Sequence, residues 1–392
     1  MSKDFLSPQR RDWMIMPLIA AATVIVVCVV FEITARNVFP PLPPGLSTCI
    51  VRNNNPQGAR LPKNSICWER IGEEHVPADY TFNNCGDRTS ITCGQKTSNR
   101  YRVVLTGTSV AVGRYLPTSR TIAEILNRDL SETAHIPVEV YNQSSMQGFL
   151  DSVGLRESEF LHNQPDMLLW VITPHDLEEN TFVPPNNEPA VVSGNGGETS
   201  FMKRGVFRIR KDIEEGTMFS DFLERFDKTY SSLLLRHLLY SSPSLYLKSA
   251  LMRPDSDAGF LRKSFSPLWE QRIQHFDSEL RKNQAWTSAA KVKLAVVYIP
   301  SRAQAEMLGE GKWPHGYDPN EIDDQLKQRV NRAGAIYVDI LPYFQARAEA
   351  DQLYFPVDGH PNEDGSAIIA RAIAQSLTDG RVAELSAGHS SR

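Results

Sequence analysis

The fold is decided by the stretch RVVLTGTSV, residues 102–110. Its first four residues form a short run rich in β-branched side chains, which is typical of a buried strand. A glycine turn ending in Ser109 follows at once, and Thr118–Leu130 then repeats apolar residues at helical spacing. Thr121 and Glu124 form a capping-box pattern near the start of that helix. The stretch therefore predicts a strand, a tight turn and a helix, which is the start of a βαβ unit.

The same rhythm continues along the chain. Further short apolar runs occupy Val138–Tyr141, Met167–Ile172, Val292–Ile299 and Ile336–Ile340. A last amphipathic stretch, Asn362–Leu377, follows the final run. Strands that alternate with helices imply right-handed crossovers and a parallel sheet covered on both faces. We predict an α/β three-layer sandwich with a five-stranded parallel sheet over residues 101–380.

A long stretch separates the third run from the fourth, and we interpret residues 177–290 as a helical insertion. It begins with Val183–Thr199, which is rich in Pro, Asn and Gly and predicts a loop. Met218–Tyr240 and Pro267–Lys282 then carry aromatic residues at helical spacing. Such a stripe is more often core than a ligand groove.

Residues 13–31 carry no charged side chain. Nineteen residues at about 1.5 Å each cover roughly 28 Å, close to the thickness of the hydrocarbon layer. Three basic residues precede this stretch and Arg36 alone follows it closely, which places residues 1–12 in the cytoplasm. We predict a single-pass membrane protein whose residues 32–392 are periplasmic or extracellular. The alternatives are a cleaved signal peptide, which would have a shorter apolar stretch, and a buried core helix.

Four of the five cysteines fall just after this stretch: Cys49, Cys67, Cys85 and Cys93. In an exported segment this number predicts two disulfides, with three pairings open. We favour Cys49–Cys67 and Cys85–Cys93 because these pairs are sequential. A zinc site is the alternative, although the spacing lacks a C-x2-C pair. Residues 32–64 predict a stalk rich in Pro and Asn, residues 65–100 a disulfide-tied lead-in, and residues 381–392 a flexible tail.

Composition excludes several classes of protein. The chain has 392 residues, 41% of them hydrophobic, which rules out a disordered protein. Lys and Arg number 42 against 46 Asp and Glu, so no strong positive field exists to bind nucleic acid. The sequence has no H-E-x-x-H, phosphate-loop or dinucleotide-binding pattern. It therefore indicates neither a metal nor an organic cofactor.

Candidate chemistry follows the apolar runs, because parallel sheets place active groups at the carboxyl ends of their strands. Ser109 follows the first run, and Asp358 and His360 come just before the final helix. A serine at a strand-to-helix turn can act as a nucleophile when a histidine reaches its hydroxyl and a carboxylate orients that histidine. The alternatives are that Ser109 only caps a helix and that His360 only belongs to a surface loop.

The order of these blocks resembles the SGNH (GDSL-type) hydrolase superfamily over residues 100–378. The resemblance implies a flavodoxin-like strand order, Ser109 as nucleophile, and Asp358 and His360 as its partners. It also implies an oxyanion hole formed by the amides of Ser109 and Gly148 together with His175.

The chain departs from the family pattern in three ways. Thr108 replaces the usual Asp before the nucleophile. A single residue separates Asp358 from His360, whereas the commonest pattern of the family has two. The shorter spacing occurs in related polysaccharide acetyl-transfer proteins. His175 stands where the family has an Asn. The segment Tyr80–Arg88 also looks like one that precedes this domain in membrane-anchored members.

These features together predict a membrane-tethered, extracytoplasmic serine esterase. Its substrates would be acyl esters, above all O-acetyl esters, of an envelope polysaccharide or exopolysaccharide. One alternative is a polysaccharide O-acetyltransferase that uses the same triad. Another is a catalytically impaired protein that binds a glycan or a partner. The expected partners are an acylated glycan, the membrane and polysaccharide-assembly machinery, with no nucleic acid.

Overall fold

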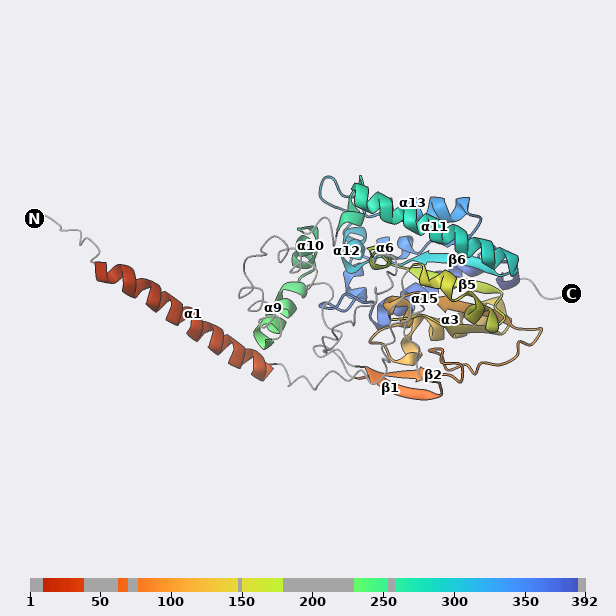
Figure 1. Ribbon diagram of the computed structural model, residues 1–392, viewed down its shortest axis with the longest axis horizontal. Helices are drawn as coiled ribbons and strands as arrows, with labels where there is room; N and C mark the ends of the chain where they lie inside the picture. Colours follow the sequence, from red (N-terminus) through yellow and green to blue (C-terminus); the bar gives the residue numbers. More distant parts are fainter. Residues whose placement is uncertain are drawn as a thin grey trace, which may run out of the picture.

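Five parallel strands form the central sheet in the order β4-β3-β5-β6-β7 (Figure 1). They are β3 (Tyr101–Thr106), β4 (Val138–Asn142), β5 (Met167–Ile172), β6 (Lys293–Tyr298) and β7 (Ile336–Val338). Every residue of β3, β4 and β5 is buried, as expected for a parallel sheet covered on both faces. This computed structural model describes residues 10–38, 63–69, 77–146, 150–178, 229–252 and 258–386. The predicted α/β class and flavodoxin-like strand order are confirmed.

Helices cover both faces of the sheet. α3 packs against α15 on one face, and α11 packs with α13 on the other (Figure 1). The helices after β3 are α2 (Ser109–Val112), α3 (Ile122–Ala134), α4 (Ser152–Leu155), α5 (Glu157–His162), α6 (Pro174–Glu178), α9 (Tyr230–Tyr240), α10 (Pro243–Leu251), α11 (Pro267–Ala289), α12 (Arg302–Glu310), α13 (Glu321–Arg332), α14 (Leu341–Gln345) and α15 (Glu363–Thr378). Short 3₁₀ turns lie at Thr118–Arg120, Gly259–Leu261, Ala350–Leu353 and Ala383–Leu385.

Helix α11 belongs to the layer that covers the sheet. Its buried face includes Trp269 and Phe276, and the Phe276 ring lies 5.5 Å from the ring of Trp170 in β5. The aromatic stripe is therefore core, and α11 leads directly into β6. The first part of the predicted insertion, residues 179–228, lies outside the described residues.

At the start of α3, the two residues of the predicted capping box have different partners. Thr121 caps the helix by accepting a hydrogen bond from the amide of Glu124. The Glu124 carboxylate turns away and accepts hydrogen bonds from the hydroxyls of Thr89 and Ser90, each at 2.7 Å. The acidic half of the pattern therefore holds the lead-in against the sheet domain.

The lead-in contains a small antiparallel hairpin of β1 (Ser65–Glu69) and β2 (Ala78–Phe82). The predicted disulfide between Cys85 and Cys93 is present, so these two thiols are not available as zinc ligands. Cys67 is also disulfide-bonded, and its predicted partner Cys49 lies outside the described residues.

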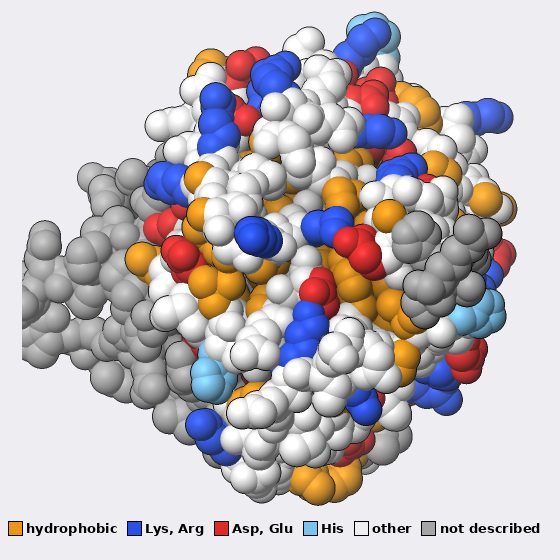
Figure 2. All heavy atoms as spheres, turned by 90° about the vertical axis from the view of Figure 1, so that its right-hand side faces the viewer, with side chains coloured by type: hydrophobic (Ala, Val, Ile, Leu, Met, Phe, Trp, Pro, Cys, Tyr) orange, Lys and Arg blue, Asp and Glu red, His pale blue; other side chains and the backbone are white. Residues whose placement is uncertain are grey.

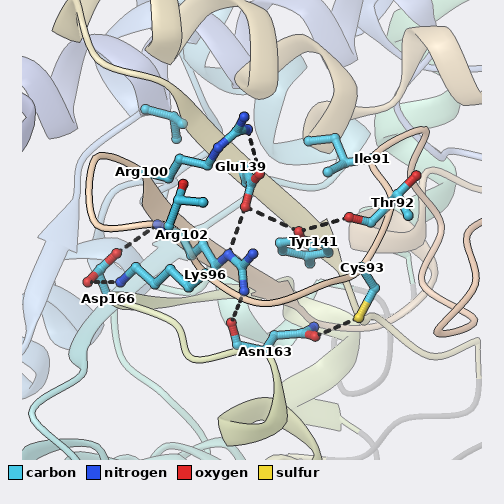
Figure 3. Close-up of polar contacts among 12 residues, drawn as sticks. Ile91, Thr92, Cys93, Lys96, Arg100, Arg102, Glu139, Tyr141, Asn163 and Asp166 are labelled. Atoms are coloured by element: carbon cyan, nitrogen blue, oxygen red, sulfur yellow. Dashed lines mark hydrogen bonds and ion pairs between the residues drawn. The ribbon is translucent and has the colours of Figure 1, made fainter.

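A network of charged side chains fastens the end of the lead-in to the start of the strands (Figure 3). The buried Arg102 of β3 donates from Nε to Glu139 of β4 at 2.7 Å, and Arg100 binds the other oxygen of Glu139 at 2.7 Å. Asp166 accepts from the backbone amide of Arg102 at 2.8 Å and forms an ion pair with Lys96. Because each buried charge has an opposite partner, the network fixes the lead-in without leaving an uncompensated charge.

Helix α1 runs from Arg10 to Val38, seven residues beyond the predicted end of the apolar stretch. The extra turns are held by an ion pair between Glu32 and Arg36 at 3.0 Å, four residues apart, and by a bond from the Asn37 side chain to the carbonyl of Ile33. Residues 32–38 are therefore helical and not part of the predicted stalk. The segment Ile15–Val38 is long and apolar enough to cross a membrane, as an anchor or as a signal sequence.

Candidate active site

The turn after β3 presents Ser109 as the first residue of α2. Thr108 is the N-cap, and its side chain makes no capping hydrogen bond. Gly107 passes so close to β5 that a Cβ there would lie 2.5 Å from the carbonyl oxygen of Val171. Only a glycine fits this approach, and it brings Ser109 to the carboxyl edge of the sheet. Ser109 is thus not the helix cap that the alternative interpretation proposed.

Asp358 and His360 lie in a tight loop just before α15. The amide of Phe355 donates to the carbonyl of His360 at 2.8 Å, and the amide of Gly359 donates back to Phe355 at 2.9 Å. Gly359 has a φ of +84°, a left-handed conformation that glycine adopts without strain. This bend lets two side chains only two residues apart turn toward one site.

The structure brings the three predicted residues into contact. His360 Nε2 lies 2.8 Å from Ser109 Oγ, although the two residues are 251 positions apart. His360 Nδ1 is hydrogen-bonded to Asp358 Oδ1, which also accepts from the His360 amide at 3.1 Å. A hydroxyl, an imidazole and a carboxylate in this sequence have the geometry of a nucleophile, a general base and an orienting group.

The charges around Asp358 favour its ionised form. Burial by itself would raise the pKa of this carboxyl. The charge and hydrogen bond of His360, and then the charge of Arg114, outweigh that effect and hold the pKa below its usual value. An ionised Asp358 can accept a hydrogen bond from Nδ1–H of His360, which would leave Nε2 without a proton and able to accept the one from Ser109.

A second layer of contacts holds the histidine ring. Tyr115 lies edge-on to His360, with ring centroids 5.5 Å apart. Its backbone has a φ of +67°, which is uncommon for a residue with a side chain. The Tyr80 hydroxyl accepts from the Tyr115 amide at 2.8 Å and donates to Glu69, whose other oxygen lies 3.4 Å from Nε of Arg114. The lead-in hairpin therefore fixes the turn that packs on His360.

Arg88 of the lead-in binds the same turn from inside. Its buried guanidinium donates to the carbonyls of Val112 at 2.6 Å and Gly113 at 2.8 Å, and also to that of Leu116. The guanidinium carbon lies 3.5 Å from the centre of the Tyr80 ring. Sequence reasoning missed the supporting role of this group. Its only signal was the family-like segment Tyr80–Arg88, which gave no partner for either residue.

We expect Tyr80→Phe to lower kcat on an ester substrate about tenfold with KM within twofold, since small displacements of catalytic groups cost up to about a hundredfold. The change removes the acceptor for the Tyr115 amide and the hydroxyl that donates to the Glu69 carboxylate. Tyr101→Phe is the matched control, because the buried Tyr101 hydroxyl has no hydrogen-bond partner in the described part of the chain. An unchanged kcat in Tyr80→Phe, with the protein folded, would contradict the supporting role.

The predicted oxyanion-hole residues are not assembled by the described contacts. Gly148 lies outside the described residues. His175 lies in the first turn of α6, partly exposed, with Nδ1 4.0 Å from Glu178. Asp176 accepts from the amide and hydroxyl of Thr173, at 2.7 Å and 2.8 Å, and so ties down the end of β5. The roles of Gly148 and His175 stay predictions.

Residues 260–390 match the family described as SGNH hydrolase-like domain, acetyltransferase AlgX. This region includes β6, β7, α15 and the loop that carries Asp358 and His360. No curated protein sequence matches the chain.

Several solved structures are similar to the chain at low identity. TesA has 10% identity and a TM-score of 0.36, over 71% of this chain and 98% of TesA. The esterase EstA from Pseudoalteromonas sp. has 10% identity and a TM-score of 0.36, over 71% of this chain and 97% of EstA. A member of the lipolytic protein G-D-S-L family from Veillonella parvula has 12% identity and a TM-score of 0.34, over 71% and 97%.

The family match and the strand order of the sheet are consistent with each other. The match covers the carboxyl-terminal third of the chain, which contains the histidine and aspartate of the site. The part that contains Ser109 has the flavodoxin-like strand order that the resemblance implies. Residues 260–390 therefore match the SGNH hydrolase-like domain, which supports an ester hydrolase or acyltransferase of that type.

Proposed function

We propose that Ser109, His360 and Asp358 form an acyl-enzyme from O-acetyl esters, and that the substrate or product is an envelope polysaccharide or exopolysaccharide. The observation that carries this proposal is the contact of His360 Nε2 with Ser109 Oγ at 2.8 Å. The family described as acetyltransferase AlgX, which matches residues 260–390, supports the acetyl group as the acyl unit.

The chemistry has two halves that share one intermediate. Ser109 Oγ attacks the ester carbonyl carbon while its proton moves to His360 Nε2. The carbonyl oxygen becomes an oxyanion, which the amides of Ser109 and Gly148 and the ring of His175 are proposed to stabilise. The tetrahedral intermediate collapses, the alcohol leaves with the proton from His360, and the acyl group stays on Ser109. Asp358 remains ionised and pairs with the imidazolium.

The second half decides between hydrolysis and transfer. Water attacking the acyl-enzyme gives an esterase, whereas a sugar hydroxyl gives an O-acetyltransferase. The residues of the site serve both acceptors equally, since each delivers its proton to His360. The family match to an acetyltransferase favours transfer as the second candidate function.

We further propose that α1 is a retained anchor and that the SGNH domain works outside the cytoplasmic membrane. The apolar span Ile15–Val38 and the disulfide between Cys85 and Cys93 support this topology. Disulfides persist in oxidising compartments and are rare in the cytoplasm.

Mass spectrometry of the intact full-length protein in detergent, quenched with acid after mixing with p-nitrophenyl acetate, tests the intermediate. We expect one added acetyl group, about 42 Da by the chemistry of acyl transfer, located on the peptide that contains Ser109. Addition of deacetylated oligosaccharides then separates the two acceptors. Free acetate alone supports the esterase, and acetylated sugar supports the transferase. The absence of any acetyl adduct and of any turnover would favour the glycan- or partner-binding alternative.

A further inference from the structure

Helix α9 is joined to the outer end of α1 (Figure 1). The Glu32 carboxylate of α1 accepts hydrogen bonds from the amide of Ser231 at 2.9 Å and from its hydroxyl at 2.7 Å. The amide of Tyr230 adds a longer contact to Glu32 at 3.4 Å. Ala35, one turn further along α1, is fully buried, and the Arg36 guanidinium lies 5.3 Å from the centre of the Tyr230 ring. The first turn of α9 is therefore fixed to the last turns of α1.

This contact sets the level of α9 relative to the proposed membrane. The apolar segment Ile15–Val38 has 24 residues. At about 1.5 Å per residue it is about 36 Å long, a little more than the roughly 30 Å of hydrocarbon. The contact residue Ala35 lies three residues, or about 4.5 Å, from the end of that segment. If α1 spans the membrane as proposed above, α9 begins at the level of the outer headgroups.

The exposed face of α9 is apolar, whereas a surface helix of a water-soluble domain exposes polar side chains. Leu235, Leu238 and Leu239 are 42%, 61% and 40% exposed, at the i, i+3 and i+4 spacing that places them on one stripe. Among the side chains of α9 that the structure describes, the buried ones are Ser231, Ser232, Arg236 and Tyr240. A surface helix normally buries its leucines and exposes its polar side chains. The inverted pattern indicates that an apolar medium covers the leucine face.

Large apolar side chains are also exposed in and just after α10. In α10, Leu245 is 43% exposed, and Met252 directly after α10 is 78% exposed. At the end of the molecule away from α1, Figure 2 shows Lys, Arg, Asp and Glu side chains interspersed among hydrophobic ones.

We propose that the helical pair α9–α10 lies in the outer headgroup boundary of the same membrane that α1 spans, with Leu235, Leu238 and Leu239 among the lipid chains. Its occupant is the lipid bilayer, because the contact with α1 places α9 at that level and the leucines face away from the protein. Amphipathic helices at such interfaces bury their apolar face about 5–10 Å into the boundary.

The pair is also bonded to the loop of the active site. The Arg302 side chain donates to the carbonyl of Tyr240, at the end of α9, at 2.9 Å and to that of Pro356. Its guanidinium lies 4.2 Å from the ring centre of Tyr246 in α10. Pro356 is two residues before Asp358. These contacts therefore hold Asp358 and His360 at a fixed height above the proposed bilayer. At that height the enzyme meets polymer segments close to the membrane surface.

Spin labels on the full-length protein in lipid nanodiscs test the proposal. The label is placed on Leu238→Cys in a Cys28→Ser background, since the outer cysteines described here are held in disulfides. Collision rates with oxygen, which enters lipid, are compared with those of a water-soluble nickel chelate. Native Cys28, exposed within α1, reports the anchor. Ala289→Cys, exposed at the end of α11 that leads to β6, reports water.

We expect the oxygen-to-nickel ratio at position 238 to be at least fivefold higher than at 289 and to approach that at Cys28. A ratio at 238 equal to that at 289, with Cys28 in lipid, would overturn the proposal and leave the anchor intact. A label at 238 shielded from both reagents would mean that protein covers the face, which also overturns it. If Cys28 itself reads as aqueous, the proposed anchor fails and this inference fails with it.

Discussion

Ser109→Ala is expected to lower kcat for hydrolysis of p-nitrophenyl acetate by about 10⁴-fold to 10⁶-fold, the range found when a serine nucleophile is removed. The alanine keeps the backbone amide and the start of α2 but leaves His360 Nε2 with no hydroxyl to deprotonate. KM should change little, because the groups that bind the substrate stay in place. Initial rates on purified full-length protein measure the effect.

Ser366→Ala is the matched control for this result. Ser366 is a fully buried serine in α15 whose hydroxyl has no hydrogen-bond partner among the residues that the structure describes. Loss of this hydroxyl should leave kcat within about twofold, because its removal breaks no hydrogen bond of the described structure. If Ser109→Ala kept more than a tenth of the wild-type rate, Ser109 would not be the nucleophile.

Asp358→Asn should lower kcat by about 10⁴-fold, the size of effect seen when an orienting carboxylate becomes an amide. An amide at position 358 donates a hydrogen bond to Nδ1 where the carboxylate accepts one. The imidazole then carries its proton on Nε2, facing Ser109, and cannot act as a base. The imidazolium that forms during attack also loses its negative partner.

The pKa of Asp358 gives this prediction a pH dependence. The pKa of this carboxyl is lowered in the folded protein, so the ionised form is favoured above the usual Asp range and is lost only as the pH falls through the lowered value. Protonation of Asp358 should therefore not limit the wild-type rate between about pH 5 and pH 8. The loss in Asp358→Asn should be nearly constant over that range in a profile of kcat/KM.

Asp379→Asn is a suitable control, because Asp379 forms an exposed ion pair with Arg381 and accepts a hydrogen bond from the Arg381 amide at 3.2 Å, and exposed ion pairs contribute little to stability. A loss of less than tenfold in Asp358→Asn, at full folding, would show that His360 is oriented by another group. A loss confined to low pH would instead mean that a different titrating residue limits the rate.

Much of the fold was predictable because its signals are local. The strands of the sheet are buried on both faces, so each one reads as a short continuous apolar run in the sequence. Helix α3 was predicted from its apolar spacing, and Thr121 marks its start as expected. The carboxyl end of α1 was less predictable, since the ion pair between Glu32 and Arg36 supports helix beyond residue 31, where the uncharged stretch ends.

The predicted part of the site follows from topology. Ser109 follows a strand and His360 precedes the last helix, and a parallel sheet brings the carboxyl ends of its strands to one edge. The oxyanion-hole predictions depend on side-chain and amide directions in loops, which no periodic pattern specifies. His175 illustrates this, because its ring lies 4.0 Å from Glu178 within its own helix.

The sequence by itself determined the α/β class and the apolar amino-terminal helix, favoured the disulfide between Cys85 and Cys93 among three pairings, and, through the family resemblance, indicated which three side chains to examine for catalysis. Only the tertiary structure decided that Tyr80 and Arg88 support the turn on His360, and that Glu32 holds the start of α9. The physical reason is that sequence periodicity records contacts within one element, at spacings of two, three or four residues. A buried polar group instead takes whichever partner the packing places beside it, however distant that partner is along the chain.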